Sequence, residues 1–74
     1  MTEQPLDAKV LTVSDGVIHG TREDKSGAAL VQQLTEAGWK VVEHRVTADG
    51  VDNVANNLRE MCGGFAGFIV STGG

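Results

Sequence analysis

Apolar residues follow two spacings along the chain, and together these spacings predict an α/β fold. Three short runs rich in apolar residues indicate strands at Ala8–Ser14, Trp39–Thr47 and Phe65–Ser71. Between these runs, apolar residues recur every three or four positions, which indicates helices from about Asp24 to Ala37 and from Val51 to Cys62. Strands that alternate with helices through short connections are typical of a parallel sheet.

Each predicted helix carries an apolar stripe and is followed by glycine. Gly38 and Gly63–Gly64 are placed to end the two helices. Because Cys62 falls on the second stripe, we expect it in the core rather than as a nucleophile. The first stripe comprises Gly27, Leu30, Val31, Leu34 and Ala37, and the second comprises Val51, Val54, Ala55, Leu58, Met61 and Cys62.

Polar residues at the predicted helix starts are candidate caps. Thr21 or Asp24 is expected to cap the first helix, and Asp49 or Asp52 the second, because their side-chain oxygens accept hydrogen bonds from free backbone N–H groups. Residues 15–23 contain two glycines and are expected to form a loop.

The second predicted strand has charged residues on both faces, which indicates an edge strand. Glu43 and Arg45 fall on one face and His44 on the other, where we expect a structural rather than a ligand role for the histidine. Right-handed crossovers then give the strand order 2-1-3, with the helices on opposite faces. The expected fold class is α/β: a Rossmann-like βαβαβ unit with a parallel sheet, the truncated first half of a three-layer α/β/α domain.

Small and polar residues follow each predicted strand at one edge of the sheet. Ligands bind at the carboxyl ends of parallel strands, so these residues are expected to line a binding crevice. Gly73-Gly74 is a candidate nest, in which successive backbone N–H groups bind an anion. Asp49 is a candidate ligand for a divalent cation. The structural alternatives are turn caps at the aspartates and an ordinary loop at the glycines. The set comprises Ser14, Asp15, Asp49, Ser71, Thr72, Gly73 and Gly74.

The common nucleotide-binding motifs do not fit this sequence. Lys25-Ser26 follows a strand and a loop, as in a P-loop, but His19 and Asp24 stand where that motif requires glycine. The G-x-G-x-x-G fingerprint is absent after the first strand. A receiver domain would need an acidic residue at the end of the third strand, where this chain has Ser71-Thr72.

The composition narrows the class of protein. The 74 residues make at most one small domain, in which burial is marginal, and the lone Cys62 cannot form an internal disulfide. A net charge of −4 argues against non-specific binding to nucleic acid. The polar N-terminus does not resemble a signal peptide, and no apolar run approaches the ~20 residues that span a membrane. We therefore expect a cytoplasmic protein with no nucleic-acid or membrane partner.

Two stretches of the chain resemble the opening of the MogA/MoaB family of molybdenum cofactor biosynthesis proteins. Val10-Leu11-Thr12-Val13-Ser14-Asp15 is similar to a family strand that ends in Ser-Asp, and Asp24-Lys25-Ser26-Gly27 is similar to the family's Asp-x-Ser-Gly helix start. Asp49 and Ile69-Val70-Ser71-Thr72-Gly73-Gly74 also fall where the family has counterparts. The resemblance covers almost all of the chain from Lys9 onward.

The resemblance implies a molybdopterin adenylyltransferase, which transfers AMP from Mg-ATP to the terminal phosphate of molybdopterin. Mg²⁺ is then the cofactor, ATP the co-substrate, and Asp49 the catalytic and metal-binding residue. Family domains are about twice as long as this chain. The resemblance also suggests a homotrimer. We therefore expect residues 1–7 to be a polar tail and residues 8–74 to be the N-terminal part of a molybdopterin-binding domain, incomplete at Gly74. The alternative is a non-catalytic module that binds phosphate or pterin, or an inactive fragment.

Overall fold

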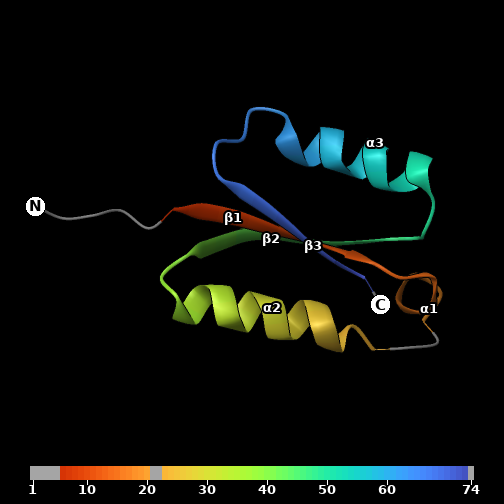
Figure 1. Cartoon of the computed structure of the whole chain (residues 1–74), viewed down its shortest axis with the longest axis horizontal. Coiled ribbons are helices and arrows are strands. Elements are labelled where there is room, and N and C mark those ends of the chain that lie inside the picture. Colours follow the sequence, from red (N-terminus) through yellow and green to blue (C-terminus); the bar gives the residue numbers. More distant parts are fainter. Residues whose placement is uncertain (1–5, 21–22, 74) are drawn as a thin grey trace, which may run out of the picture.

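A three-stranded parallel sheet with helices on both faces forms the centre of the molecule (Figure 1). The computed structural model describes residues 6–20 and 23–73. Both outer strands pair in parallel with the first, which confirms the predicted 2-1-3 order. In chain order the elements are β1 (Asp7–Val13), α1 (Asp15–Ile18), α2 (Lys25–Glu36), β2 (Lys40–Thr47), α3 (Val51–Cys62) and β3 (Phe68–Gly73).

The core sits on β1, because α2 and α3 cover its two opposite faces (Figure 1). Neighbouring residues on β1 point to opposite faces, yet Val10 and Leu11 are both fully buried. Met61 of α3 is the other large apolar side chain that is fully buried among the described residues. The predicted three-layer arrangement is therefore confirmed. In the part of the chain that the structure describes, no helix is long and apolar enough to cross a membrane.

Helix α2 begins and ends where its sequence predicts. Asp24 is the N-cap, and its Oδ1 accepts a hydrogen bond from the Gly27 backbone N–H (2.9 Å). Thr21, the other candidate cap, lies outside the described residues. Gly38 follows the helix with a φ of +96°, a conformation that glycine adopts without steric cost. Ala37 is the C-cap and is exposed, so the buried stripe is one residue shorter than expected.

Strand β2 lies at one edge of the sheet and has different partners on its two faces. Its register against β1 skips Val42, since Ala8 pairs with Val41 and Lys9 with Glu43. Beyond this bulge, Arg45 reaches Glu60 of α3, whereas His44 reaches the cap of α2 on the other face. The charges on both faces therefore reflect polar contacts with two helices, as an edge strand allows.

A single helical turn, α1, lies where the sequence predicted only a loop. Ser14 is its N-cap and Oγ accepts a hydrogen bond from the Val17 backbone N–H (3.3 Å). The prediction was wrong here because a four-residue helix is too short to show an apolar period.

The expectations about both ends of α3 also need correction. Its N-cap is Gly50, with a φ of +122° and no side-chain hydrogen bond, so neither Asp49 nor Asp52 caps the helix. Val51 is 84% exposed and Cys62 is exposed as well, so the expected core position of Cys62 was wrong. The buried stripe is narrower than the apolar pattern, and comprises Val54, Ala55 and Leu58, which are half-buried, with Met61 fully buried.

Strand β3 begins three residues later than predicted and continues to Gly73. Phe65 still belongs to the turn after α3, where its N–H donates to the Cys62 carbonyl (3.1 Å). Gly67 passes so close to the Asp7 carbonyl that a Cβ would collide with it. Pairing with β1 therefore starts at Phe68, opposite Ala8.

Candidate functional site at the carboxyl edge of the sheet

Ser14 joins the ends of β1 and β2 at this edge. Its backbone N–H donates to the Thr47 carbonyl (2.9 Å), and its hydroxyl caps α1, so the side chain is buried within the turn. Ser14 is a predicted binding residue, but its hydroxyl oxygen already accepts a hydrogen bond within the fold. The next residue, Asp15, starts α1 and is exposed.

Asp15 and Asp49 come together although 34 positions separate them in the sequence. The Asp49 backbone N–H donates to Asp15 Oδ1 (2.9 Å), which links the turn after β1 to the turn after β2. The Asp49 carboxylate turns back on its own chain, since Oδ1 accepts a hydrogen bond from the Gly50 N–H (2.9 Å). Both aspartates are exposed. Two predicted site residues therefore share one small surface.

Asp15 and Asp49 carry carboxylate oxygens, the type of ligand that Mg²⁺ prefers. Mg²⁺ is usually bound by one or two carboxylates together with substrate phosphates and water. Within residues 6–20 and 23–73 no three His, Cys, Asp or Glu side chains gather as a metal site, so the protein offers no closed cage. The donors present suit a hard cation that arrives with a phosphate ligand. A shallow hollow of about 370 Å³ adjoins Asp49 and is otherwise lined by Gly50, Val51, Val54, Ala55 and Leu58.

The end of β3 lies beside the end of β1, as the predicted strand order requires. Thr72 pairs with Thr12 and Gly73 with Val13, one residue before Ser14. A Cβ at Gly73 would meet no atom within 4 Å, so packing among the described residues does not require glycine here. Ser71 and Gly73 are exposed and Thr72 is half-buried. Gly74 lies outside the described residues.

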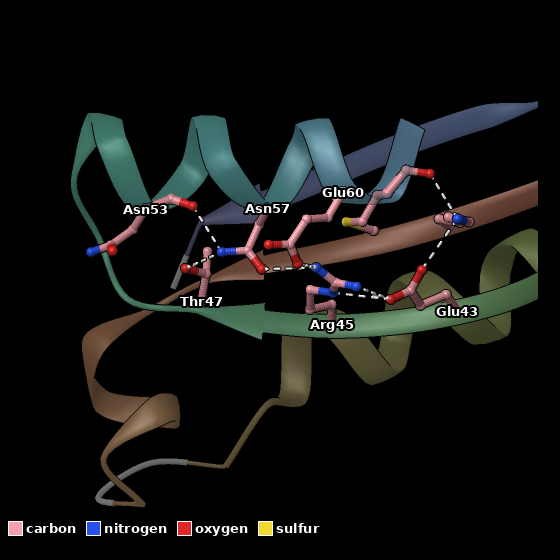
Figure 2. A network of polar contacts seen from close by, with 8 residues as sticks. Glu43, Arg45, Thr47, Asn53, Asn57 and Glu60 are labelled. Atoms are coloured by element: carbon pink, nitrogen blue, oxygen red, sulfur yellow. Dashed lines mark hydrogen bonds and ion pairs between the residues drawn. The ribbon is translucent and has the colours of Figure 1, made fainter. Parts of the chain in front are cut away.

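Two asparagines of α3 bind the turn that carries Asp49, and sequence reasoning missed them. Asn53 Nδ2 donates to the Asp49 carbonyl (3.1 Å), and Asn57 Nδ2 donates to Thr47 Oγ1 (3.0 Å). Figure 2 shows both asparagines on the side of α3 that faces β2, with Arg45 next to Asn57. Their spacing of four residues, which places them on one helix face, was the available signal.

Charged residues continue this network toward the other end of β2 (Figure 2). Arg45 contacts both Glu43 (2.7 Å) and Glu60 (2.7 Å), and these hydrogen bonds raise the pKa of its guanidinium. The Arg45 hydrogen bond holds the pKa of the Glu43 carboxyl below its ordinary value of 4.5, against the opposing effect of desolvation. Lys9 of β1 adds a second cation 3.3 Å from Glu43.

A separate polar cluster ties the start of α2 to the sheet. Asp24 Oδ2 lies 2.7 Å from His44 Nε2 and accepts a hydrogen bond from the hydroxyl of the fully buried Thr12 (2.9 Å). His44 therefore contacts the N-cap of α2, which is consistent with the expected structural role. His19, the other histidine, is exposed at the end of α1.

Solved structures share this fold. A putative molybdenum cofactor biosynthesis protein from Corynebacterium diphtheriae superposes with a TM-score of 0.81 at 24% identity, over 89% of this chain and 43% of that one. The protein CinA, of unknown function, from Thermoplasma acidophilum superposes with a TM-score of 0.80 at 23% identity, over 93% of this chain and 40% of that one. At these identities the likeness shows the fold alone.

Sequence comparison is more specific. The chain is 37% identical over 65 residues to a molybdopterin adenylyltransferase from Pyrococcus furiosus, a match that covers 88% of this chain and 38% of the relative. The chain thus spans less than half the length of that curated relative. The profile of a family described as a probable molybdopterin binding domain matches residues 9–74. The expected resemblance is confirmed, and the chain belongs to this molybdopterin-binding domain family of molybdenum cofactor biosynthesis.

Proposed function

We propose that the protein containing this chain transfers AMP from Mg-ATP to the terminal phosphate of molybdopterin. The observation that carries this proposal is the contact between Asp49 and Asp15, which sets two carboxylates at the sheet edge where α/β proteins bind ligands. Family membership and the name of the curated relative support the same reaction.

The reaction needs charge control more than it needs a strong base. A terminal phosphate oxygen of molybdopterin attacks the α-phosphorus of ATP, the bond from that phosphorus to the bridging oxygen breaks, and pyrophosphate leaves. The attacking oxygen is already anionic, so no proton has to be removed. Repulsion between like charges makes the step slow, and positioning together with electrostatic stabilisation speeds it.

The proposed roles follow from where the residues lie. Asp49, with Asp15 beside it, would hold Mg²⁺, which neutralises phosphate charge when bound. Ser14 fixes the turn that presents Asp15. The segment Ser71-Thr72-Gly73-Gly74 would bind a phosphate-bearing substrate through its backbone N–H groups.

We also propose that residues 8–74 are the N-terminal part of a longer domain. The expected end of the polar tail at residue 7 is one residue too late, because β1 begins at Asp7. The match covers 38% of the curated relative, which supports a longer domain. The remainder of such a domain would complete the site beyond Gly74. A cytoplasmic homotrimer is the assembly that the family resemblance suggests.

Two substitutions of Asp49 test the reaction in the complete protein. Asp49→Ala is expected to abolish or strongly reduce AMP transfer while the melting temperature stays nearly unchanged, because the side chain is exposed and Gly50 is the helix cap. Asp49→Asn keeps an oxygen for the Gly50 N–H but is a poorer Mg²⁺ ligand, so it should also be slow.

The measurement is adenylylated molybdopterin formed per minute from Mg-ATP, alongside the melting temperature. Near-wild-type turnover of Asp49→Asn at ordinary Mg²⁺ concentrations would show that Asp49 is structural. Wild-type protein that binds molybdopterin without forming any adenylylated product would instead identify a non-catalytic binding module.

A further inference from the structure

The turn between β2 and α3, residues 48–50, is bound to the face of the helix that follows it. Asn53 donates to the Asp49 carbonyl (3.1 Å), and Asn57 donates to the hydroxyl of Thr47, the last residue of β2 (3.0 Å). Figure 2 shows the contact from Asn57 to Thr47, with Asn53 one helical turn earlier on α3. Asn57 Nδ2 also donates to the Asn53 carbonyl (2.8 Å). One pair of side chains thus holds both sides of the segment that carries Asp49.

The orientation of the Asn57 amide is fixed by its neighbours. Its Oδ1 accepts a hydrogen bond from Arg45 (3.2 Å), which leaves the NH₂ group to face Thr47. Arg45 is itself held by Glu43 and Glu60. Because Thr47 is only 5% exposed, its hydroxyl has little access to water as an alternative partner. The contact from Asn57 to the end of β2 is therefore geometrically defined.

Asn53 and Asn57 supply hydrogen bonds from α3 to the Asp49 turn and to the end of β2. Gly50 gives the helix start no side-chain hydrogen bond and has a φ of +122°, and Asp49 is exposed. The other restraints are the hydrogen bonds from the Asp49 N–H to Asp15, from the Ser14 N–H to the Thr47 carbonyl, and from the Gly50 N–H to the Asp49 carboxylate. Small displacements of a reacting group cost large factors in rate, so a short turn that carries such a group needs support.

We propose that Asn53 and Asn57 are positioning residues, which hold Asp49 where AMP transfer requires it. This inference rests on the proposed function, because it assigns the two asparagines a part in that reaction. Neither asparagine touches the reacting atoms: both act through the backbone on either side of Asp49.

Two variants of the complete protein remove these contacts, and a third asparagine provides matched controls. Asn57→Asp keeps an oxygen for Arg45 but loses the donor to Thr47, and Asn53→Ala loses the donor to Asp49. Asn56 lies on the same helix, is exposed, and accepts a hydrogen bond from Arg59 instead of contacting the turn (3.2 Å). Asn56→Asp and Asn56→Ala therefore reproduce the chemical changes away from Asp49.

Amide hydrogen exchange at Asp49 gives a readout that does not depend on activity. The Asp49 N–H is bonded to Asp15, so it should exchange slowly in the wild type and about fivefold faster in Asn57→Asp and Asn53→Ala. The Asn56 variants should exchange like the wild type. Faster exchange throughout the sheet would mean general destabilisation and would overturn the proposal.

Steady-state kinetics give the second readout. Both test variants should lower kcat for AMP transfer by about 10- to 100-fold, the usual effect of losing outer-shell support, with little change in the KM for molybdopterin. Exchange and turnover equal to those of the Asn56 variants would refute the positioning role. If the wild type transfers no AMP, the proposed function fails, and exchange at Asp49 alone then decides whether the asparagines fix the turn.

Discussion

At the scale of single residues, Gly27 shows why the Asp-x-Ser-Gly start of α2 needs its glycine. Asp24 accepts hydrogen bonds from the Gly27 N–H and from the hydroxyl of Thr12, and it pairs with His44. A Cβ at Gly27 would collide with the Thr12 hydroxyl and with the Asp24 carboxylate. Both of these atoms are engaged in the cap, so neither moves aside without losing a hydrogen bond.

Gly27→Ala is therefore expected to lower the free energy of unfolding by about 1–3 kcal/mol, as overpacking does. This loss runs against the helix propensity of alanine, which alone would favour the variant. Gly63→Ala is the control, because the nearest atom to its Cβ lies 3.5 Å away, an ordinary contact. Urea unfolding of the complete protein measures both. A Gly27→Ala variant as stable as Gly63→Ala would contradict the packing described here.

At the scale of elements, charge contacts join α3 to the sheet alongside the buried side chain of Met61. Glu43 lies between Arg45 and Lys9, and Arg45 continues to Glu60 on α3. The Lys9 ammonium also donates to the Met61 carbonyl (2.7 Å), so β1 takes part in the same network. The docking of α3 on β2 should therefore depend on pH.

Acid should weaken this docking through Glu43. Its pKa is lowered on folding, chiefly by the Arg45 hydrogen bond, so its contribution to stability is present above the ordinary value of 4.5 and is lost as the pH falls through the folded pKa. Glu43→Gln has no such carboxyl and should lose less stability between about pH 6 and pH 3. The difference should stay below about 1 kcal/mol, because the side chains are partly exposed. Urea midpoints at several pH values measure this difference. An equal loss of stability toward low pH in the wild type and in Glu43→Gln would refute the assignment.

The sequence predicted the elements better than their ends. The 2-1-3 order followed from the charges on β2 and from crossover handedness, both of which are properties of whole elements. The shift of β3 was not predictable, because it depends on the approach of Gly67 to the Asp7 carbonyl, 60 positions away. Cys62 was misplaced because a helical stripe does not reveal how much of it a neighbouring layer covers.

The candidate site was predictable in its parts but not in its connections. Asp15 and Asp49 were picked because each follows a strand, yet nothing in the sequence showed that a hydrogen bond joins them. Asn53 and Asn57 were overlooked because asparagine on an exposed helix face usually contacts water. Their partners, the Asp49 carbonyl and the Thr47 hydroxyl, lie on a turn whose path is set by tertiary structure.

At the scale of the whole molecule, much of the apolar surface lacks cover. Four hydrophobic residues form the fully buried core of the described residues: Ala8, Val10, Leu11 and Met61. Phe68 is 57% exposed on β3, whose outer edge has no partner strand among the described elements. An unpaired edge strand and exposed apolar side chains favour association.

The 74 residues alone are therefore expected to be poorly folded or to self-associate. Sedimentation at several concentrations and a thermal melt followed by circular dichroism would measure this. The expected result is a broad transition, a mass that rises with concentration, or both. A monomer with a sharp two-state transition would show that the three-stranded unit is stable by itself.

The most direct test of the central claim follows the α-phosphate of ATP. The complete protein is mixed with molybdopterin, Mg²⁺ and ATP labelled at the α-phosphorus, and the products are separated. The account predicts that label enters molybdopterin while an equal amount of pyrophosphate is released, and that Asp49→Ala stops both. Label that stays in ATP, or that appears only as free AMP, would contradict adenylyl transfer by this protein.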